Sequence, residues 1–223
     1  FGFYATYSLG KAKSDTDGPE TFPANSFDLS GEYGRSAVDV RHRFLFGGSI
    51  NAPGKITLSP FVVAYAGLPY NITTGVDTNG DQQFTERPSF ATDASRPGVV
   101  SLAGLLLDPN PAFDQQTIPR NFGNGPAFII ANLRLSKAIS FGSKATVGAG
   151  TPGARSEKRF NLTFSLQGQN IFNRTNPNTP IGNMRSALFA KSNAAATAYS
   201  SGLGLGSTTA GNRRLEARVR FSF

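Results

Sequence analysis

The closing stretch Arg213-Arg-Leu-Glu-Ala-Arg-Val-Arg-Phe-Ser-Phe223 alternates between apolar and polar residues without a break. Every second residue from Leu215 to Phe223 is apolar, and the residues between them are charged or polar. A period of two is typical of a β-strand with two unlike faces. The stretch also has about the length, roughly 9–11 residues, with which a tilted strand crosses a bilayer. A strand of a soluble sheet shows the same pattern, so the fold depends on the rest of the chain.

Five upstream segments share this alternation, or an enrichment in aromatic residues, over the length of one strand. With the closing stretch they predict six strands, over residues 1–10, 36–50, 56–70, 127–141, 158–171 and 213–223. In the second segment, one apolar face is predicted to carry the residues Val38, Val40, His42, Phe44 and Phe46. Aromatic residues gather within the six segments, many near their ends, which favours the girdles of a membrane barrel over an ordinary Phe-rich core.

The connections between the predicted strands alternate between long and short. By subtraction they are 25, 5, 56, 16 and 41 residues long. In an up-and-down sheet, the three long connections then share one end and the two shorter ones the other. Long structureless loops are uncommon in compact soluble domains, whereas outer-membrane barrels combine short periplasmic turns with long extracellular loops. The sequence therefore predicts an all-β, antiparallel, up-and-down transmembrane β-barrel.

Six strands are too few to close a wide barrel. We therefore expect residues 1–223 to be one partial barrel, formed by the C-terminal strands and loops of a larger protein, with open edges that need further strands. The chain begins without an initiator Met and shows no signal peptide, which agrees with an excerpt. Its end, Phe223, is predicted to lie at the periplasmic rim.

Composition excludes several other classes of protein. The chain has no cysteine, which excludes disulfides, cysteine-based zinc sites and a thiol nucleophile. Its net charge of +8 would suit a nucleic-acid-binding protein. The Lys and Arg residues are scattered, however, and alternate with apolar residues inside the predicted strands, so we expect no nucleic-acid partner. No apolar run approaches the roughly 18–20 residues of a transmembrane helix.

Three short stretches carry a resemblance to a known family. The closing strand, with its final Phe223, is similar to the terminal strand that the barrel-assembly machinery recognises. The segment Gln169-Asn-Ile-Phe-Asn-Arg-Thr-Asn176 is similar to the ending of a late barrel strand, and Thr73-Thr-Gly-Val-Asp-Thr-Asn-Gly-Asp81, followed by Glu86-Arg-Pro88, is similar to a recurring loop. On these residues the chain resembles the C-terminal barrel portion of TonB-dependent outer-membrane receptors, in particular the Oar-like group.

The resemblance implies a location in the bacterial outer membrane and a part in substrate uptake. This chain would supply barrel wall and ligand-facing extracellular loops, with no enzymatic activity. The implied partners are outer-membrane lipid, the remaining strands and plug of the parent chain, the TonB complex, and the barrel-assembly machinery. The plug domain, the TonB-box segment and the carboxypeptidase-like domain of the family have no counterpart in residues 1–223.

The loop Asp77-Thr-Asn-Gly-Asp81 carries oxygen ligands at alternating positions. Ca²⁺ binds six to eight oxygens, and this spacing lets one turn supply several of them. The EF-hand pattern is broken, because Gln82 and Pro88 occupy the positions of its invariant Gly and its last Glu. Two interpretations follow. One is an Asn-Gly turn in a solvated loop, and the other is a calcium site formed by Asp77, Asn79, Asp81 and Glu86.

Charged residues occupy one face of the predicted strands, where a barrel would turn them toward its lumen. They are Asp39, Arg41, Arg43, Arg134, Arg214, Glu216, Arg218 and Arg220. One interpretation is an electropositive wall that guides anionic solutes. The interpretation we favour is a ladder of cross-strand ion pairs, or contacts to a plug, because opposite charges share the face.

Two other classes of protein are alternatives. A soluble β-sandwich, binding a carbohydrate or another ligand, would use the same alternating strands and fold without detergent. A hydrolase on an all-β scaffold would need acidic residues to converge in a cleft, such as Asp93, Asp108 or Asp114, and no spacing singles these out. Ser-His-Asp catalysis would have to use His42, which lies within a predicted strand on its apolar face. We therefore predict no catalytic residue.

Overall fold

The computed structural model describes residues 1–112, 115–147, 155–196 and 211–223. Within these ranges, six long strands form one sheet in the order β1-β4-β5-β11-β12-β13, and every neighbouring pair is antiparallel. The strands are β1 (Gly2–Leu9), β4 (His42–Ala52), β5 (Ile56–Tyr65), β11 (Phe128–Val147), β12 (Arg155–Gln169) and β13 (Arg214–Ser222). Because their order in space follows their order in the chain, the predicted up-and-down sheet is confirmed. In the described ranges no helix is long and apolar enough to span a membrane.

The register of the sheet produces one apolar and one polar face. Leu166 of β12 lies opposite Leu135 of β11 and Ala217 of β13. The next residue, Gln167, lies opposite Arg134. Side chains alternate across a strand, so each face collects one kind of residue from strand to strand. The alternation seen in the sequence is therefore the alternation between these two faces.

The apolar face has no second layer over it in the part of the chain that the structure describes. Many of its large side chains are at least 37% exposed, namely Phe3, Tyr7, Leu9, Phe44, Ile50, Ile129, Leu135, Ile139, Phe141, Phe164, Leu166, Leu215, Val219 and Phe221. A β-sandwich would bury such a face against another sheet. The structure therefore does not support the soluble β-sandwich alternative.

Aromatic rings of the apolar face form two rows near the end of the sheet where the short turns lie. One row joins Phe141, Phe160, Phe221 and Phe223, with successive ring centroids 5.6, 5.8 and 5.8 Å apart. The other runs from Phe1 through Phe3 to Phe46, with centroids 5.8 and 5.7 Å apart. Outer-membrane barrels carry aromatic girdles at the bilayer interfaces, and these rows agree with the girdle at the short-turn rim.

Four predicted strand boundaries are wrong by more than two residues, among them the end of the third strand, which is Tyr65 instead of residue 70. The second strand begins at His42 instead of residue 36, because a turn precedes it in which the N–H of Asp39 donates to the carbonyl of Ser36 at 2.9 Å. The predicted 16-residue connection between the fourth and fifth strands is partly paired, since β11 runs to Val147 and β12 begins at Arg155. The register shifts beyond Phe141, where Gly142 has a φ of 93°, as glycine allows at a bulge.

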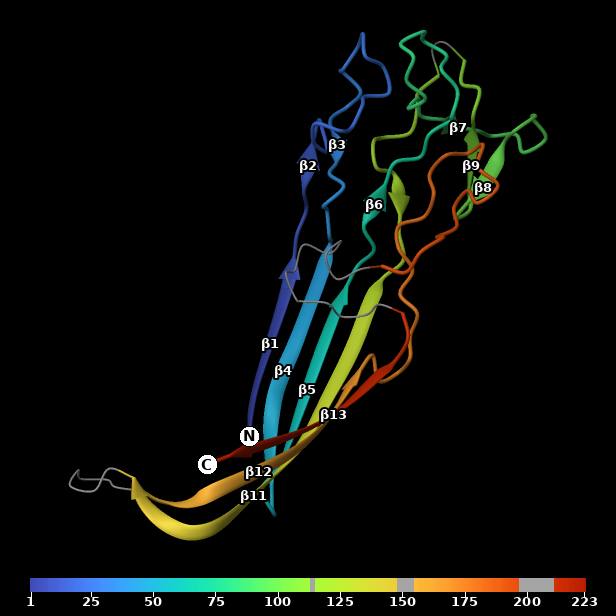
Figure 1. Ribbon diagram of the computed structural model, residues 1–223. Helices are drawn as coiled ribbons and strands as arrows, with labels where there is room; N and C mark the ends of the chain where they lie inside the picture. The colour runs from blue at the N-terminus through green and yellow to red at the C-terminus, as the bar shows by residue number, and fades with distance from the viewer. Residues whose placement is uncertain (113–114, 148–154, 197–210) are drawn as a thin grey trace.

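The described parts of the three long connections lie together at one end of the sheet, and the hairpin turn between β4 and β5 lies at the other (Figure 1). The expectation that these connections are structureless is wrong. They contain short antiparallel pairings, of β2 (Lys13–Ser14) with β3 (Gly34–Arg35), of β6 (Pro69–Tyr70) with β10 (Gly123–Asn124), and of β9 (Leu105–Asp108) with β7 (Ser89–Phe90) and β8 (Val100–Leu102). We call the described parts of residues 10–41, 66–127 and 170–213 the cap.

The cap has a hydrophobic core of its own, and a second core joins it to the sheet. The first consists of Tyr70, Ile72, Leu107 and Ile118. In the second, Val40 and Ala196 of the cap pack over Val63 and Tyr65 of β5 and over Phe128 and Ile130 of β11. The β5 and β11 residues of this second core lie on the polar face of the sheet, near its cap end. The cap therefore covers this part of the polar face.

Candidate functional site

Six of the eight predicted lumen charges lie on the polar face of the sheet, namely Arg43, Arg134, Arg214, Glu216, Arg218 and Arg220. The predicted ladder of cross-strand ion pairs is absent from the described strands. Glu216 instead contacts a residue of its own strand, with its Oε1 2.9 Å from Nε of Arg214. Arg134 donates from Nη2 to the Ser165 hydroxyl at 3.3 Å. Within the described chain, four of these arginines therefore have no acidic partner: Arg43, Arg134, Arg218 and Arg220.

Asp39 and Arg41 are not lumen-facing strand residues, because both precede β4. Asp39 is buried in the cap, where it accepts the N–H of Ala12 at 2.7 Å and pairs with Arg35 at 3.2 Å. Arg41 is exposed and donates from Nη1 to the carbonyl of Gly10 at 3.4 Å. Both residues stabilise the base of the first long connection rather than the barrel wall.

Two ion pairs connect the first and second long connections, one of them buried on both sides and the other largely buried. Asp17 contacts Arg120 at 2.6 Å, and Glu32 contacts Arg87 at 2.9 Å. Burial alone would raise the pKa of Asp17, but three contacts outweigh it: the backbone N–H of Ala37, the amide of Asn121 and the positive charge of Arg120. The pKa therefore lies below the usual value of 3.8. Removing one partner of such a pair leaves an uncompensated buried charge, so these contacts hold the two loops together.

An asparagine-rich turn follows β12 and organises the third long connection. Asn170 and Asn173 have positive φ angles of 48° and 52°, a conformation that asparagine tolerates better than most residues. The side chain of Asn173 accepts the N–H of Arg213 at 2.8 Å, just before β13. Asn176 is fully buried, accepts the N–H of Ile129 at 2.9 Å and donates to its carbonyl at 3.0 Å. The turn therefore joins the cap ends of β11, β12 and β13.

Three of the four predicted calcium ligands come together in the second long connection. Asp77, Asp81 and Glu86 each offer a carboxylate oxygen, and these oxygens all lie within 4.8 Å of one another. The fourth residue, Asn79, accepts the N–H of Asp81 at 2.9 Å and donates to the carbonyl of Ala24 at 3.1 Å. A set of carboxylate oxygens suits a hard cation such as Ca²⁺, whereas zinc sites favour nitrogen and sulfur ligands.

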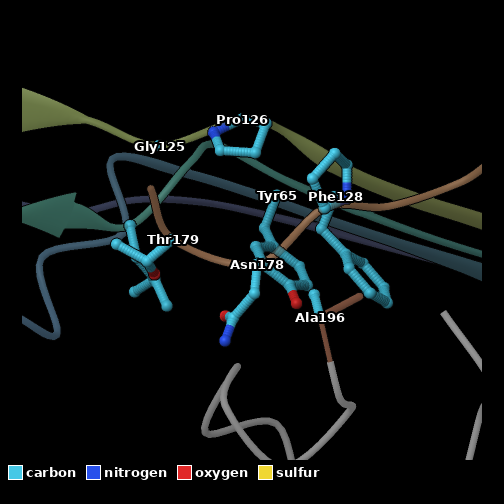
Figure 2. A pocket seen from close by; sticks show the side chains of 9 residues that line it. Tyr65, Gly125, Pro126, Phe128, Asn178, Thr179 and Ala196 are labelled. Carbon is cyan, nitrogen blue, oxygen red and sulfur yellow. The ribbon is translucent and has the colours of Figure 1, made fainter. Parts of the chain in front are cut away.

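One cleft lies within the cap, and another lies where the cap meets the sheet. The first has a volume of about 410 Å³ and is lined by Asp17, Tyr70 and Arg120, among others. Arg120 is buried, and its Nη1 has no hydrogen-bond partner in the described structure. The other cleft, shown in Figure 2, lies beside the stacked rings of Tyr65 and Phe128, whose centroids are 4.5 Å apart. Its volume of about 20 Å³ leaves room for about one water molecule.

The residues weighed for catalysis are held in structural contacts. His42 is the first residue of β4, and its Nδ1 lies 2.8 Å from the hydroxyl of Tyr7 on the apolar face. Asp93 accepts hydrogen bonds from the hydroxyl and N–H of Ser95, which lower its pKa, and Asp108 is buried in a pair with Arg96. Asp114 lies outside the described residues.

An antiparallel sheet with one apolar and one polar face, short turns at one end and long loops at the other is the wall of an outer-membrane β-barrel. The comparison with protein families agrees. Residues 1–215 match the family model described as "Outer membrane beta barrel domain", and the chain belongs to this family. The family places the chain in the bacterial outer membrane. A search of the curated proteins and of the solved structures found no match.

This family membership orients the molecule. Short turns of outer-membrane barrels face the periplasm and long loops face outward, so the cap is extracellular. Phe223 lies at the short-turn end, beside the ring of Phe221, and thus at the predicted periplasmic rim.

The sequence did not reveal the ion pairs that hold the cap together. Asp17 and Glu32 lie far along the chain from their partners, Arg120 and Arg87. The single signal was Arg87 itself, which stands in the Glu86-Arg-Pro88 segment that carries part of the family resemblance. Pairing it with Glu32 requires knowledge of how the loops fold against each other.

Proposed function

We propose that this chain forms wall and extracellular cap of an Oar-like TonB-dependent receptor, which takes up a substrate through its barrel. The observation that carries the proposal is the polar face of the sheet. Within the described chain, Arg43, Arg134, Arg218 and Arg220 have no acidic partner there. Charges that face a barrel interior need counter-charges or water, and a plug or an anionic solute would supply them.

The proposed partners correspond to distinct surfaces. The exposed apolar face contacts outer-membrane lipid, and β1 and β13, which each pair with a single strand in the described sheet, contact the remaining strands of the barrel. The polar face contacts the plug. The barrel-assembly machinery recognises the closing strand with Phe223, and the TonB complex acts through segments outside residues 1–223. We propose neither an enzymatic activity nor a nucleic-acid partner.

The cleft of about 410 Å³ is the place in the cap that we propose for first contact with the substrate. It combines the apolar ring of Tyr70 with the polar side chains of Asn71 and Asn121. Arg120 also lines the cleft and pairs with Asp17, so both a cation and a carboxylate border it. Apolar lining with a few placed polar groups is typical of ligand sites.

Crosslinking in cells tests the proposal. The natural full-length protein, with a photoreactive residue on the periplasmic side of its plug, should form an adduct with TonB. The yield should rise when substrate-rich medium is supplied, because TonB-dependent receptors are expected to expose their TonB-binding segment on loading. A protein that reaches the outer membrane and never forms this adduct is not a TonB-dependent receptor. An adhesin-like surface receptor would then be the better assignment.

A charge-reversal experiment tests the contact between wall and plug. Replacing Arg218 and Arg220 with Glu should weaken the contact between the barrel wall and an acidic surface of the plug. The conductance of the full-length protein in planar bilayers should then rise. The matched control is Arg185→Glu in the exposed third connection, which changes charge away from the wall. Equal conductance of both variants and wild type would contradict the proposed contact.

A further inference from the structure

The carboxylates of Asp77, Asp81 and Glu86 converge in a loop that its own backbone holds in place. Asp77 accepts the N–H of Gly80 at 2.7 Å and that of Gln82 at 2.9 Å. Gln82 has a φ of 64°, at the position where an EF-hand loop has its invariant Gly for the sharp turn. Thus the loop turns at that position without glycine and brings its acidic side chains to one point.

Glu86 provides an independent indication that a cation is bound there. Glu86 is buried, with 8% of the residue exposed. Its Oε1 accepts the N–H of Thr78 at 2.6 Å, whereas its Oε2 is buried and has no hydrogen-bond partner in the described structure. A buried oxygen of an ionised carboxylate without a partner is strongly unfavourable. The unsatisfied Oε2 therefore needs a ligand.

No side-chain cation of the described chain fills this role. None of the described ion pairs includes Asp77, Asp81 or Glu86. The neighbouring Arg87 is engaged elsewhere, because its guanidinium contacts Glu32 at 2.9 Å and donates to the carbonyl of Gly31 at 3.0 Å. Three carboxylates with oxygens this close repel one another unless a positive charge lies between them.

We propose that Asp77, Asp81 and Glu86 bind one Ca²⁺ ion. Ca²⁺ takes six to eight oxygen ligands in flexible geometry, and backbone carbonyls or water complete a set that side chains begin. Mg²⁺ demands near-ideal octahedral geometry and keeps several waters, so a partly buried site of three loop carboxylates suits it less. Extracellular calcium modules bind with a Kd of about 10⁻⁴–10⁻³ M, and we expect this range here.

The ion would stabilise the contact between two extracellular loops. Asp81 accepts the N–H of Ser26 at 2.9 Å, and the side chain of Thr85 donates to the carbonyl of Pro23 at 2.6 Å. These bonds attach the site in the second connection to residues 23–26 of the first. Loss of Ca²⁺ would restore the repulsion among the three carboxylates and loosen this attachment.

Calcium binding to the natural full-length protein in detergent tests the proposal. After chelation and desalting, Ca²⁺ itself is titrated by calorimetry, and bound calcium is counted by atomic emission. Glu86→Gln should bind one Ca²⁺ fewer per chain than wild type, or bind it at least about tenfold more weakly. Asp93→Asn is the matched control, because Asp93 is an exposed acid of the same connection that contacts only its own turn; its binding should equal that of wild type.

Protease resistance of the cap provides a second measurement. If the site binds calcium, the effect of Glu86→Gln on the cleavage rate should reverse when Ca²⁺ is replaced by chelator. With Ca²⁺ present, Glu86→Gln should be cleaved faster than wild type. With chelator present it should be cleaved more slowly, because one of three repelling charges is gone. Heat-modifiable gel migration confirms that each variant contains a folded barrel. Unchanged calcium stoichiometry and affinity in Glu86→Gln, or the same cleavage ratio with and without Ca²⁺, would overturn the proposal.

Discussion

Leu166 offers a direct test of which face of the sheet contacts lipid. It lies on the apolar face of β12, is 50% exposed, and is six residues beyond Phe160 of the aromatic row. At about 3.3 Å per residue and a tilt of about 45°, six residues rise about 14 Å along the membrane normal. The apolar band of such barrels is about 25 Å tall. Leu166 therefore lies near its middle.

Arginine at this depth is expected to destabilise the folded barrel by about 2–4 kcal/mol. At about 1.4 kcal/mol per tenfold change, the folding equilibrium falls about 30-fold to about 700-fold. The matched variant is Gln167→Arg, one residue along the same strand. Residue 167 lies on the polar face between Arg134 and Glu216, so an arginine there would have one neighbour of like charge and one of opposite charge. We therefore expect the folding free energy to change by no more than about 0.5 kcal/mol. Leu166→Ala measures the loss of the leucine alone.

The assay is urea titration of the natural full-length protein folded into lipid vesicles, followed by heat-modifiable gel migration. Leu166→Arg should lower the midpoint strongly and Gln167→Arg only slightly. If Gln167→Arg is as destabilising as Leu166→Arg, the assignment of the apolar face to lipid and of the polar face to the barrel interior is wrong. If both variants equal wild type, the sheet does not contact hydrocarbon at this position.

Three further predictions concern the cap and the closing strand. Asn176→Ala removes both hydrogen bonds to the backbone of Ile129 and should destabilise the cap by about 2–4 kcal/mol, as measured by urea titration. The control is Asn178→Ala, which should have little effect because the Asn178 side chain makes no hydrogen bond in the described structure. The pKa of Asp17 is lowered in the folded cap, so its stabilising contribution is complete above the unfolded value of 3.8 and is lost as the pH falls through the lower folded pKa. The protection of cap amides against hydrogen exchange, corrected for the intrinsic exchange rate at each pH, should therefore fall from about pH 5 to about pH 3 in wild type. It should fall less in Asp17→Asn, and an equal response would refute the assignment. Phe223→Ala should reduce the amount of heat-modifiable protein recovered from the outer membranes of cells. Refolding of the purified variant into vesicles should stay unchanged. An equal loss in both would indicate an effect on stability rather than on recognition by the assembly machinery.

The strands were predictable because parity alone sets the environment of a side chain in a single-layer sheet. Leu166 and Gln167 differ by one position and face different surroundings, so their alternation is visible without any knowledge of tertiary structure. The start of β4 was not predictable in this way. Val38 and Val40 continue the alternation by chance, but Asp39 pairs with Arg35 and the chain turns there. A turn stabilised by its own contacts can carry the same pattern as a strand.

In the candidate calcium site, too, the features that depend on neighbouring residues were predictable, and those that depend on contacts between distant loops were not. Asp77, Asp81 and Glu86 lie within ten residues, so their spacing already indicated oxygen ligands for one ion. Their position against the first connection was not visible, because it depends on contacts such as that between Asp81 and Ser26, 55 residues apart. Parity placed six of the eight predicted charges on the polar face, but not Asp39 and Arg41, which precede β4. It did not give the partners of these charges, since register and rotamer decide which charges meet.

The long connections that form the cap are ordered, and this order favours a role in ligand binding. Long loops lose much conformational entropy when they become ordered, and loops that only close hairpins have no need of order. Here they have a buried core around Ile72 and Leu107 and buried ion pairs such as that of Glu32 with Arg87. Gly182 even permits the third connection to approach the backbone of Asn71 where any Cβ would collide with its oxygen. A ligand that meets loops already ordered avoids their ordering cost and binds more tightly. Preorganisation of this kind is expected of a surface that recognises a ligand, and it is the reason to look for any ligand at the cap before the barrel interior.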